Sequence, residues 1–248
     1  KAKYERFAKA YEFYFDKSTR FMRGLDSEGN WRTPFNPRAS NHRNDDYCEG
    51  TAWQWTWFVP HDVDGLVELM GGRDAFIGKL DSLFTADSKL EGESTSVDIS
   101  GLIGQYAHGN EPSHHIAHLY NYVGQPWRTQ EIVDEVLHTL YFNNPDGLSG
   151  NEDCGQMSAW YILNAMGFYQ VCPGKPVYSI GRPLFNEATV HLKDGKSFKV
   201  IAHNNSRDNK YVRSIVLNGN KLETPFFTHQ DIVDGGTLEL TMGSEPLK

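Results

Sequence analysis

The sequence predicts a mainly α-helical fold with a smaller β region at the C-terminus. From Lys1 to about Gly174, apolar residues recur at spacings of three and four, the period of amphipathic helices. After Pro173, short segments alternate apolar and polar residues and are separated by turn dipeptides, a pattern typical of antiparallel strands. We therefore expect a helical module over residues 1–174 and a small antiparallel β module over residues 175–248.

The first part of the helical module begins with one long amphipathic pattern, which predicts a helix from Lys1 to near Phe21. The aromatic run Ala52 to Phe58 has the composition of a strand. Asp62 is a good N-cap for a helix over Val63 to Met70, and two glycines follow that helix.

Further helices are predicted along the rest of this module. They cover residues 74–83, residues 112–123 with Pro112 in the first turn, a segment that Thr129 caps and that runs to about Tyr141, and residues 156–166 with Gly167 as the stop. Antiparallel helices joined by long loops suggest an α-toroid. We expect only part of one, because a closed double ring of about twelve helices needs a longer chain.

The β module contains five segments of period two: VYSIG, ATVHL, SFKVIA, SIVLNG and TLELTM. Turns at Asp194-Gly195, Asn218-Gly219 and Gly235-Gly236 are expected to separate strands here, since these dipeptides tolerate positive φ angles.

Composition narrows the range of functions. The net charge is −8 and no basic run occurs, which argues against nucleic-acid binding and fits a protein that binds a cation or a neutral polar substrate. Six Trp, twelve Tyr and fourteen Phe could stack on sugar faces. Three irregularly spaced cysteines do not form a disulfide framework or a zinc ribbon, and no apolar run is long enough to span a bilayer.

The first motif, EGTAWQWTWFVPHD, places Glu49 before a tryptophan-rich segment. Burial against those rings would raise the pKa of a carboxyl group toward that of a general acid. The alternative is that Glu49 caps a helix or forms a surface ion pair. Trp53 in the same run is a candidate substrate contact. Asp62 is a weaker catalytic candidate, because it resembles an N-cap.

The second motif, HGNEPSHH, places Asn110 and Glu111 at a junction between a loop and a helix, together with His114. His114 and His118 have the i, i+4 spacing of a zinc site, but no glutamate follows the first histidine as in HExxH, and structural histidines are more common. The oxygen atoms of Asn110 and Glu111 instead suit a hard cation such as calcium.

The third motif, GNEDCGQ, places Asn151 and Asp153 just before a helix N-terminus, which would keep Asp153 ionised as a base or metal ligand. The alternative is simple capping. Three acidic helix entrances would converge on one rim of a toroid. Glycosidic hydrolysis needs two carboxyl groups across the sugar, and a separation of roughly 6.5–9.5 Å leaves room for a water that inverts the anomeric centre.

These three motifs, together with NYVGQPWRTQ and GFYQVCPGKPVYSIGRPLF, closely resemble the C-terminal half of the family 92 α-mannosidases over nearly the whole chain. The resemblance implies a calcium-dependent, exo-acting, inverting enzyme in which an N-terminal β-sandwich precedes an (α/α)6 barrel. It also implies that Glu49 is the general acid and Asp153 the general base. Asn110 and Glu111 would line the sugar subsites or bind calcium, and Asp153 would be a further calcium ligand.

One position departs from some members of the family, which carry an aspartate where this chain has Asn151. An amide cannot act as a base, so Asn151 would orient water or sugar, and His114 is a further expected substrate contact. The N-terminal sandwich and the early barrel helices have no counterpart here, so the chain resembles a fragment whose partner is that missing domain.

The resulting hypothesis is the C-terminal catalytic segment of a secreted or periplasmic α-mannosidase that removes terminal mannose from glycans. An α-1,2 linkage is expected, although the sequence does not determine it. The first alternative is a carbohydrate-binding or inactive scaffold of the same fold. A polysaccharide lyase fits less well, because lyases need a Tyr or His base and a cationic clamp.

Overall fold

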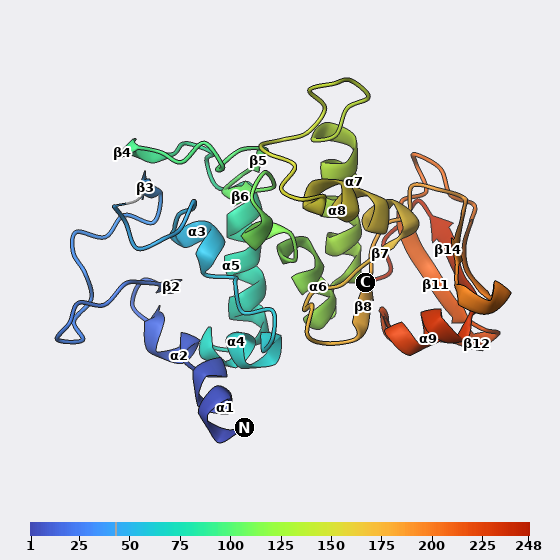
Figure 1. Ribbon diagram of the computed structural model, residues 1–248, viewed down its shortest axis with the longest axis horizontal. Coiled ribbons are helices and arrows are strands. Elements are labelled where there is room, and N and C mark those ends of the chain that lie inside the picture. The colour runs from blue at the N-terminus through green and yellow to red at the C-terminus, as the bar shows by residue number, and fades with distance from the viewer. Residues whose placement is uncertain (43) are drawn as a thin grey trace. The chain divides into compact units, whose positions relative to one another are not determined.

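The computed structural model describes residues 1–42 and 44–248, and along the chain most of the helices precede the larger sheet (Figure 1). The chain packs as two units. Unit 1 contains residues 1–114 and 148–151, and unit 2 contains residues 115–147 and 152–248. The protein is therefore a mixture of helices and small sheets. Because unit 2 joins several helices to the β segment, the division near residue 174 is not the division between these units, and it stays a prediction about domains.

Unit 1 is organised around one long helix, and its strands are short. Its helices are α1 (Ala2–Ala8), α2 (Tyr11–Tyr14), α3 (Ala52–Trp55), α4 (Val63–Leu69), α5 (Arg73–Thr85) and the 3-10 turn η1 (Glu111–Ser113). Its strands are β1 (Phe15–Asp16), β2 (Phe21–Met22), β3 (Ala39–Asn41), β4 (Glu91–Ser94), β5 (Leu102–Ile103) and β6 (Tyr106–Ala107). The core forms where Phe76 and Leu80 of α5 are fully buried and Trp57 meets Phe76 edge-on, with ring centroids 5.3 Å apart.

The N-terminal helix is shorter than the sequence predicted. The helical pattern ends at Tyr14, and the chain then forms the antiparallel pair β1–β2. A buried ion pair explains the change, because Arg23 Nη1 lies 2.7 Å from Asp16 Oδ2 and the same carboxylate accepts bonds from Ser18 and Thr19. These contacts fix a tight turn where amphipathic periodicity alone predicts a continued helix.

The tryptophan-rich run begins as a helix and not as the strand that its aromatic composition suggested. Thr51 and Gln54 form a capping box at the start of α3: the Thr51 hydroxyl accepts from the Trp53 amide, and the Gln54 side chain accepts from the Thr51 amide. Capping of this kind satisfies helix amides that would otherwise lack partners. The prediction that Asp62 caps the next helix is confirmed, because its side chain accepts from the Gly65 amide.

Unit 2 contains the remaining elements. Its helices are η2 (Ile116–His118), α6 (Leu119–Tyr122), α7 (Pro126–Thr139), α8 (Gln156–Met166), η3 (Lys193–Gly195) and α9 (His229–Asp234). Its strands are β7 (Phe168–Tyr169), β8 (Val177–Ile180), β9 (Glu187–His191), β10 (Ser197–His203), β11 (Tyr211–Leu217), β12 (Asn220–Lys221), β13 (Phe226–Thr228) and β14 (Gly236–Gly243). Residues 112–123 thus form η1, η2 and α6 instead of one helix. The bounds of α8 agree with the prediction, and Gly167 ends it at a φ of 103°.

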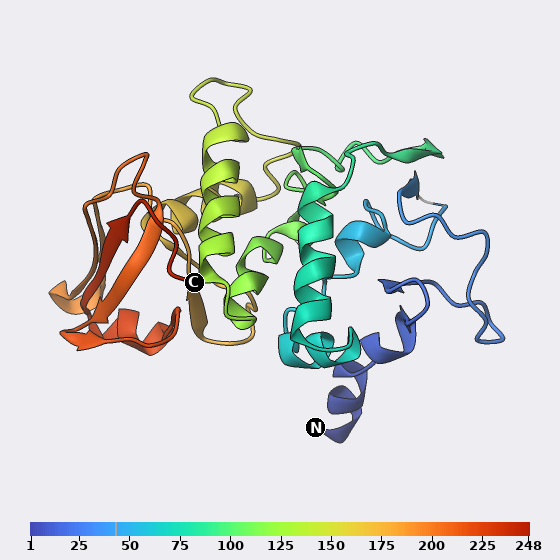
Figure 2. The same ribbon diagram turned by 180° about the vertical axis from the view of Figure 1, so that it is seen from behind.

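The larger sheet has the strand order β12-β11-β14-β10-β9, and it lies beside α7 and α8 (Figure 2). It corrects the prediction of a purely antiparallel module, because β10 and β14 pair in parallel. The cause is topological: β14 returns after α9 and inserts between β10 and β11. There it runs antiparallel to β11 and parallel to β10. The Asn218-Gly219 turn joins β11 to β12 with both φ angles positive, as predicted for a tight hairpin.

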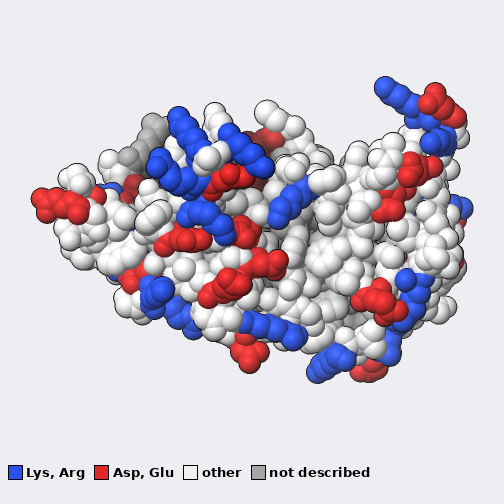
Figure 3. Space-filling model, turned by 90° about the horizontal axis from the view of Figure 1, so that it is seen from below, with Lys and Arg blue, Asp and Glu red and all other residues white. Residues whose placement is uncertain are grey.

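Charged side chains of both signs lie on the surface of the protein. On the face shown in Figure 3, Lys and Arg side chains are mixed with Asp and Glu side chains. Within the part of the chain that the structure describes, none of the helices combines the length and the apolar character that crossing a bilayer requires.

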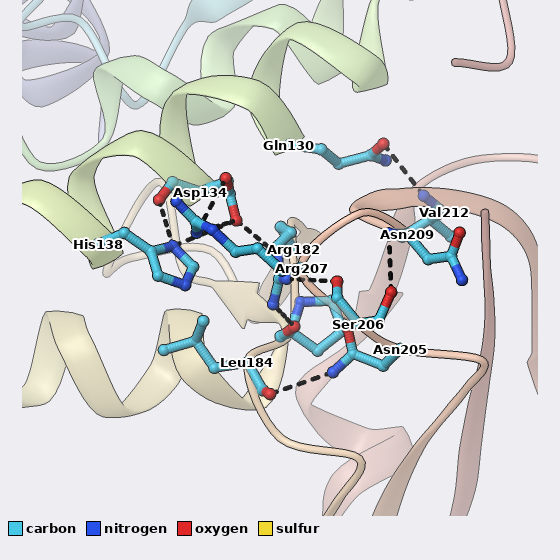
Figure 4. A network of polar contacts seen from close by, with 11 residues as sticks. Gln130, Asp134, His138, Arg182, Leu184, Asn205, Ser206, Arg207, Asn209 and Val212 are labelled. Atoms are coloured by element: carbon cyan, nitrogen blue, oxygen red, sulfur yellow. Dashed lines mark hydrogen bonds and ion pairs between the residues drawn. The ribbon is translucent and has the colours of Figure 1, made fainter. Parts of the chain in front are cut away.

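A polar network joins α7 to the loops of the β segment (Figure 4). The carboxylate of Asp134 lies 2.8 Å from Arg182 Nε, 3.2 Å from His138 Nδ1 and 3.4 Å from Arg207 Nη1. Arg182 also donates to the Ser206 carbonyl at 3.0 Å. The Arg182 side chain is only 3% exposed, whereas that of Arg207 is 61% exposed. Arg182 therefore depends on Asp134 for its compensating charge.

We predict that Asp134→Asn lowers the free energy of unfolding by about 3 kcal/mol, because it leaves a buried guanidinium without its counter-charge. Arg207→Ala, which removes an exposed member of the same network, should cost less than about 1 kcal/mol. Urea denaturation followed by tryptophan fluorescence measures both. Equal effects of the two substitutions would contradict this description.

A second prediction concerns pH. His118 is fully buried between Ser179 and Asn164, with ring nitrogens 3.0 Å and 2.8 Å from their side-chain oxygens. Burial lowers the pKa of His118 to about 4. The unfolded chain binds a proton below a pH of about 6.5, whereas the folded chain does not until about pH 4. Stability should therefore fall as the pH drops through this window, by up to roughly 3 kcal/mol.

The measurement is the free energy of unfolding between pH 7 and pH 4 for the wild type and for His118→Gln. The variant should be less stable at pH 7 and should show a weaker pH dependence. An unchanged slope in the variant would show that other groups cause the pH effect.

Candidate active site

Glu49 lies in a turn whose backbone has an unusual conformation. Its φ angle is 51°, in the left-handed region that residues with a side chain rarely adopt. Such a conformation costs on the order of 1–2 kcal/mol and persists only where neighbouring groups hold it. The Glu49 side chain is exposed. The expected burial of this carboxyl group against the tryptophans that follow it is therefore not observed among the described residues.

Two hydrogen bonds hold this turn. The Trp55 indole nitrogen donates to the Cys48 carbonyl at 2.8 Å, and the Asn110 amide nitrogen donates to the Glu49 carbonyl at 2.8 Å. Gly50 permits the first contact, because a Cβ there would lie 2.7 Å from the Trp55 nitrogen. The carboxyl-bearing residue is thus fixed through its backbone, which leaves its side chain available.

Glu49 faces a cavity of about 610 Å³ in unit 1. The lining residues are His42, Asp45, Asp46, Tyr47, Cys48, Glu49 and Asp98. Most of its carboxylates are already engaged: Asp45 accepts from the Tyr47 amide at 2.9 Å, and Asp46 pairs with Arg32. An acidic cavity of this kind favours cations and the hydroxyl groups of a polar ligand.

The second motif forms a rigid loop beside α3. Asn110 is 6% exposed and precedes η1, while His114 is 1% exposed. His114 Nε2 lies 3.0 Å from the His108 carbonyl, and the two imidazoles stack with centroids 5.0 Å apart. Burial lowers the pKa of His108 well below its ordinary value, so the His108 imidazole is uncharged at neutral pH. In this position His114 supports the loop and does not face solvent.

Trp53 is partly buried and packs against neighbouring side chains. It meets Phe21 edge-on at 4.9 Å between ring centroids, and the Lys79 ammonium lies 4.6 Å from its ring. Burial lowers the pKa of Lys79 to about 7, with a contribution from the charge of Arg20. The tryptophan that contacts the Glu49 turn is Trp55.

Asn151 of the third motif belongs to unit 1 and lies next to the Glu49 cavity. Its amide nitrogen is 3.4 Å from Asp98 Oδ1, and the Ser96 hydroxyl donates to Asp98 Oδ2 at 2.7 Å. Gly150 packs closely against this region, because a Cβ there would lie 2.7 Å from the Gly109 carbonyl. The structure therefore brings Glu49, Asp98 and Asn151 together, along with Asn110.

Asp153 belongs to unit 2 and has a second left-handed backbone. The φ angles are 47° at Asp153, 58° at Cys154 and 91° at Gly155. The capping alternative proposed for Asp153 is not observed, since Glu152 binds the first amides of α8: its carboxylate accepts from the Gly155 and Ser158 amides. The hydrogen bond from the Ser158 amide is the main cause that lowers the pKa of Glu152. The Asp153 side chain is exposed.

Asp98, Trp55 and His42 are site residues that the sequence interpretation missed. Asp98 stands alone in VDISG, without a neighbouring motif, so its place beside Asn151 depends on the folding of a distant loop. Trp55 is one of three tryptophans at alternate positions, and only the start of α3 determines which of them reaches the turn.

The predicted calcium ligands have suitable chemistry but are few. Asn110, Glu111 and Asp153 offer hard oxygen donors, whereas calcium takes six to eight oxygens. Among residues 1–42 and 44–248, no three His, Cys, Asp or Glu side chains are grouped so as to hold a metal ion. Any calcium bound by these residues would thus need further oxygen ligands from backbone, water, substrate or additional chain.

Comparison with solved structures places the chain among glycosidases. An α-mannosidase of family GH92 from Bacteroides thetaiotaomicron, determined with mannoimidazole bound, is 43% identical with a TM-score of 0.89, and the match covers 96% of this chain and 32% of that chain. An inverting mannosidase of the same family and organism is 41% identical with a TM-score of 0.85, covering 99% of this chain and 34% of that one.

Sequence comparison agrees. A protein called "Uncharacterized secreted glycosidase" from Arthroderma benhamiae is 32% identical over 200 residues, which cover 79% of this chain and 24% of that protein. The chain thus spans about a quarter to a third of the length of these relatives. The family model described as "Glycosyl hydrolase family 92 catalytic domain" matches residues 1–244, which is nearly the whole chain. The protein therefore belongs to glycosyl hydrolase family 92.

Proposed function

We propose that this chain is the catalytic segment of an inverting, calcium-dependent exo-α-mannosidase, with Glu49 as general acid and Asp153 as general base. The observation that carries the proposal is that both residues have left-handed backbones with exposed side chains. Backbone strain of this kind is concentrated at functional sites. Family membership and the resemblance of the solved mannosidases add independent support.

In the proposed mechanism, Glu49 donates its proton to the oxygen of the departing sugar while Asp153 removes a proton from the attacking water. Asn151 follows from the same loop: its amide orients the water or a sugar hydroxyl. Only one residue, Glu152, lies between Asn151 and Asp153, which limits the distance between their Cα atoms to about 7 Å.

Calcium would be held by oxygens of Glu111 and Asp153 together with ligands from outside these side chains. Asn110, the third ligand that the sequence suggested, is given no calcium role, because its side-chain amide donates to the Glu49 carbonyl. A bound calcium ion would supply positive charge that binds the mannose hydroxyl groups and helps to distort the sugar ring toward the transition state. His114 is buried and Trp53 packs against Phe21, so we assign the direct sugar contacts to Asn151 and Glu111.

We place this segment within an (α/α)6 barrel whose remaining helices, with an N-terminal β-sandwich, belong to the same polypeptide. The substrate would be terminal mannose of glycans, with α-1,2-linked mannose as the expected linkage. A secreted or periplasmic location fits a glycan-degrading enzyme, and it fits the name of the fungal relative. Rates on α-1,2-, α-1,3-, α-1,4- and α-1,6-mannobiose would decide the linkage.

The alternative is a carbohydrate-binding scaffold of the same fold without turnover. Retention of both carboxyl groups favours the enzyme, because binding alone requires neither an exposed acid nor strained backbones at Glu49 and Asp153. A scaffold would bind mannosides and release no mannose.

We predict that Glu49→Gln, in the polypeptide extended toward its N-terminus to the length of the relatives, lowers the rate on α-mannobiose about 10³-fold. An aryl α-mannoside with a good leaving group needs no proton from the acid, so most of the activity on it should remain. Asp153→Asn should impair both substrates. Glu135→Gln on the exposed side of α7 serves as the control. A Glu49→Gln enzyme with full activity on mannobiose would remove the acid assignment.

We also predict that chelation with EGTA abolishes mannose release by the extended polypeptide and that added calcium restores it. Magnesium should restore little, since it demands a smaller octahedral site. Initial rates at a series of free calcium concentrations measure this, and a rate independent of calcium would contradict the proposed cofactor.

A further inference from the structure

Two consecutive backbone carbonyls in unit 1 each accept a hydrogen bond from a distant side chain. Trp55 Nε1 reaches the Cys48 carbonyl from α3, and Asn110 Nδ2 reaches the Glu49 carbonyl from the residue that precedes η1. The peptide units on both sides of the Glu49 α-carbon are therefore fixed. These are the units whose rotation would change its φ angle of 51° and swing the carboxyl group away.

The donors of both bonds are themselves held in place. Asn110 is 6% exposed, and its carbonyl accepts from the Ser113 amide at 3.1 Å. Trp55 meets Phe58 edge-on at 5.2 Å and approaches the turn closely at Gly50. A donor on a rigid support can hold a strained acceptor, whereas a donor on a mobile side chain would follow it.

We propose that Asn110 and Trp55 are positioning residues for Glu49, which hold the turn so that the carboxyl group points into its cavity. This inference rests on the proposed function of Glu49. It gives Asn110 a role as a hydrogen-bond donor, whereas the sequence interpretation used it as an oxygen ligand for calcium. Neither residue needs to touch the reacting atoms.

Asn110→Asp separates the two roles of Asn110. Aspartate has the same shape and keeps an oxygen for a cation, so a calcium ligand would tolerate the change. It cannot donate to the Glu49 carbonyl, and its ionised oxygen would repel that carbonyl. A positioning residue should therefore be damaged as much by aspartate as by alanine.

Trp55→Phe tests the other bond. Phenylalanine keeps an aromatic ring but lacks the indole N–H that donates to the Cys48 carbonyl. Trp127→Phe and Asn220→Asp make the same chemical changes in unit 2 and serve as matched controls.

The first readout is amide hydrogen exchange of the 248-residue chain, which needs no activity. The Thr51 amide donates to Gln54 Oε1 at 2.7 Å directly after the turn. Its exchange should be about tenfold faster in Asn110→Asp, Asn110→Ala and Trp55→Phe and unchanged in both controls, with thermal midpoints close to the wild type. Unchanged exchange at Thr51 in all three variants would overturn the proposal. If one variant fails to fold, the remaining ones decide.

The second readout is kinetics of the extended polypeptide. Misplacement of an acid should lower kcat about 10- to 100-fold in Asn110→Asp and Asn110→Ala, with KM within about threefold and an unchanged calcium requirement. Near-normal kcat in Asn110→Asp, combined with a raised calcium requirement in Asn110→Ala, would make Asn110 a ligand and overturn the proposal.

The failure of the proposed function looks different. In that case Glu49→Gln would keep the wild-type rate, while the exchange measurement would still decide whether Asn110 and Trp55 hold the turn.

Discussion

The left-handed backbone at Glu49 is the constraint on which the candidate site depends. A glutamate in this conformation is unfavourable by itself, and it exists because two side chains bind the adjacent carbonyls and because Gly50 leaves room for one of them. The capping box of α3 and the hydrogen bond from the Ser113 amide to the Asn110 carbonyl hold those donors in turn. Much of unit 1 near the cavity thus serves to fix one exposed carboxyl group through its backbone.

Unit 2 solves a similar problem at Asp153 in another way. Three consecutive left-handed residues lead into α8, and Glu152 takes the helix amides that Asp153 would otherwise cap. The base candidate therefore stays unengaged by the helix. Behind it, α8 and α7 pack near the β segment, and the buried Arg182 and Asp134 pair ties α7 to the loops of that segment (Figure 4). The β strands thereby support the helices of unit 2 and do not form a separate appendage.

Periodicity and capping predicted the local elements best. The bounds of α8 follow from its apolar face and its Gly167 stop, and α4 follows from the Asp62 cap. The sequence could not reveal that a buried Asp16 and Arg23 pair ends the first helix, because that contact forms only in the folded turn. The parallel pairing of β10 and β14 depends likewise on the order in which strands enter the sheet.

The motifs led to Glu49 and Asp153 through residue type and resemblance, but they gave the wrong physical setting. Glu49 is exposed instead of buried against tryptophan, and Asp98 and Trp55 carry no pattern of their own. Their contacts join residues about fifty positions apart or depend on the start of a short helix, and neither feature can be read from local sequence.

The central claim is that Glu49 and Asp153 act as an acid and base pair on opposite sides of the sugar. The anomeric configuration of the first-formed mannose tests it most directly. Proton NMR during hydrolysis of an α-mannobiose by the extended polypeptide should show β-mannose first, with the α anomer appearing only through mutarotation. Initial formation of α-mannose would contradict the account, because it requires a covalent intermediate on one of the two carboxyl groups.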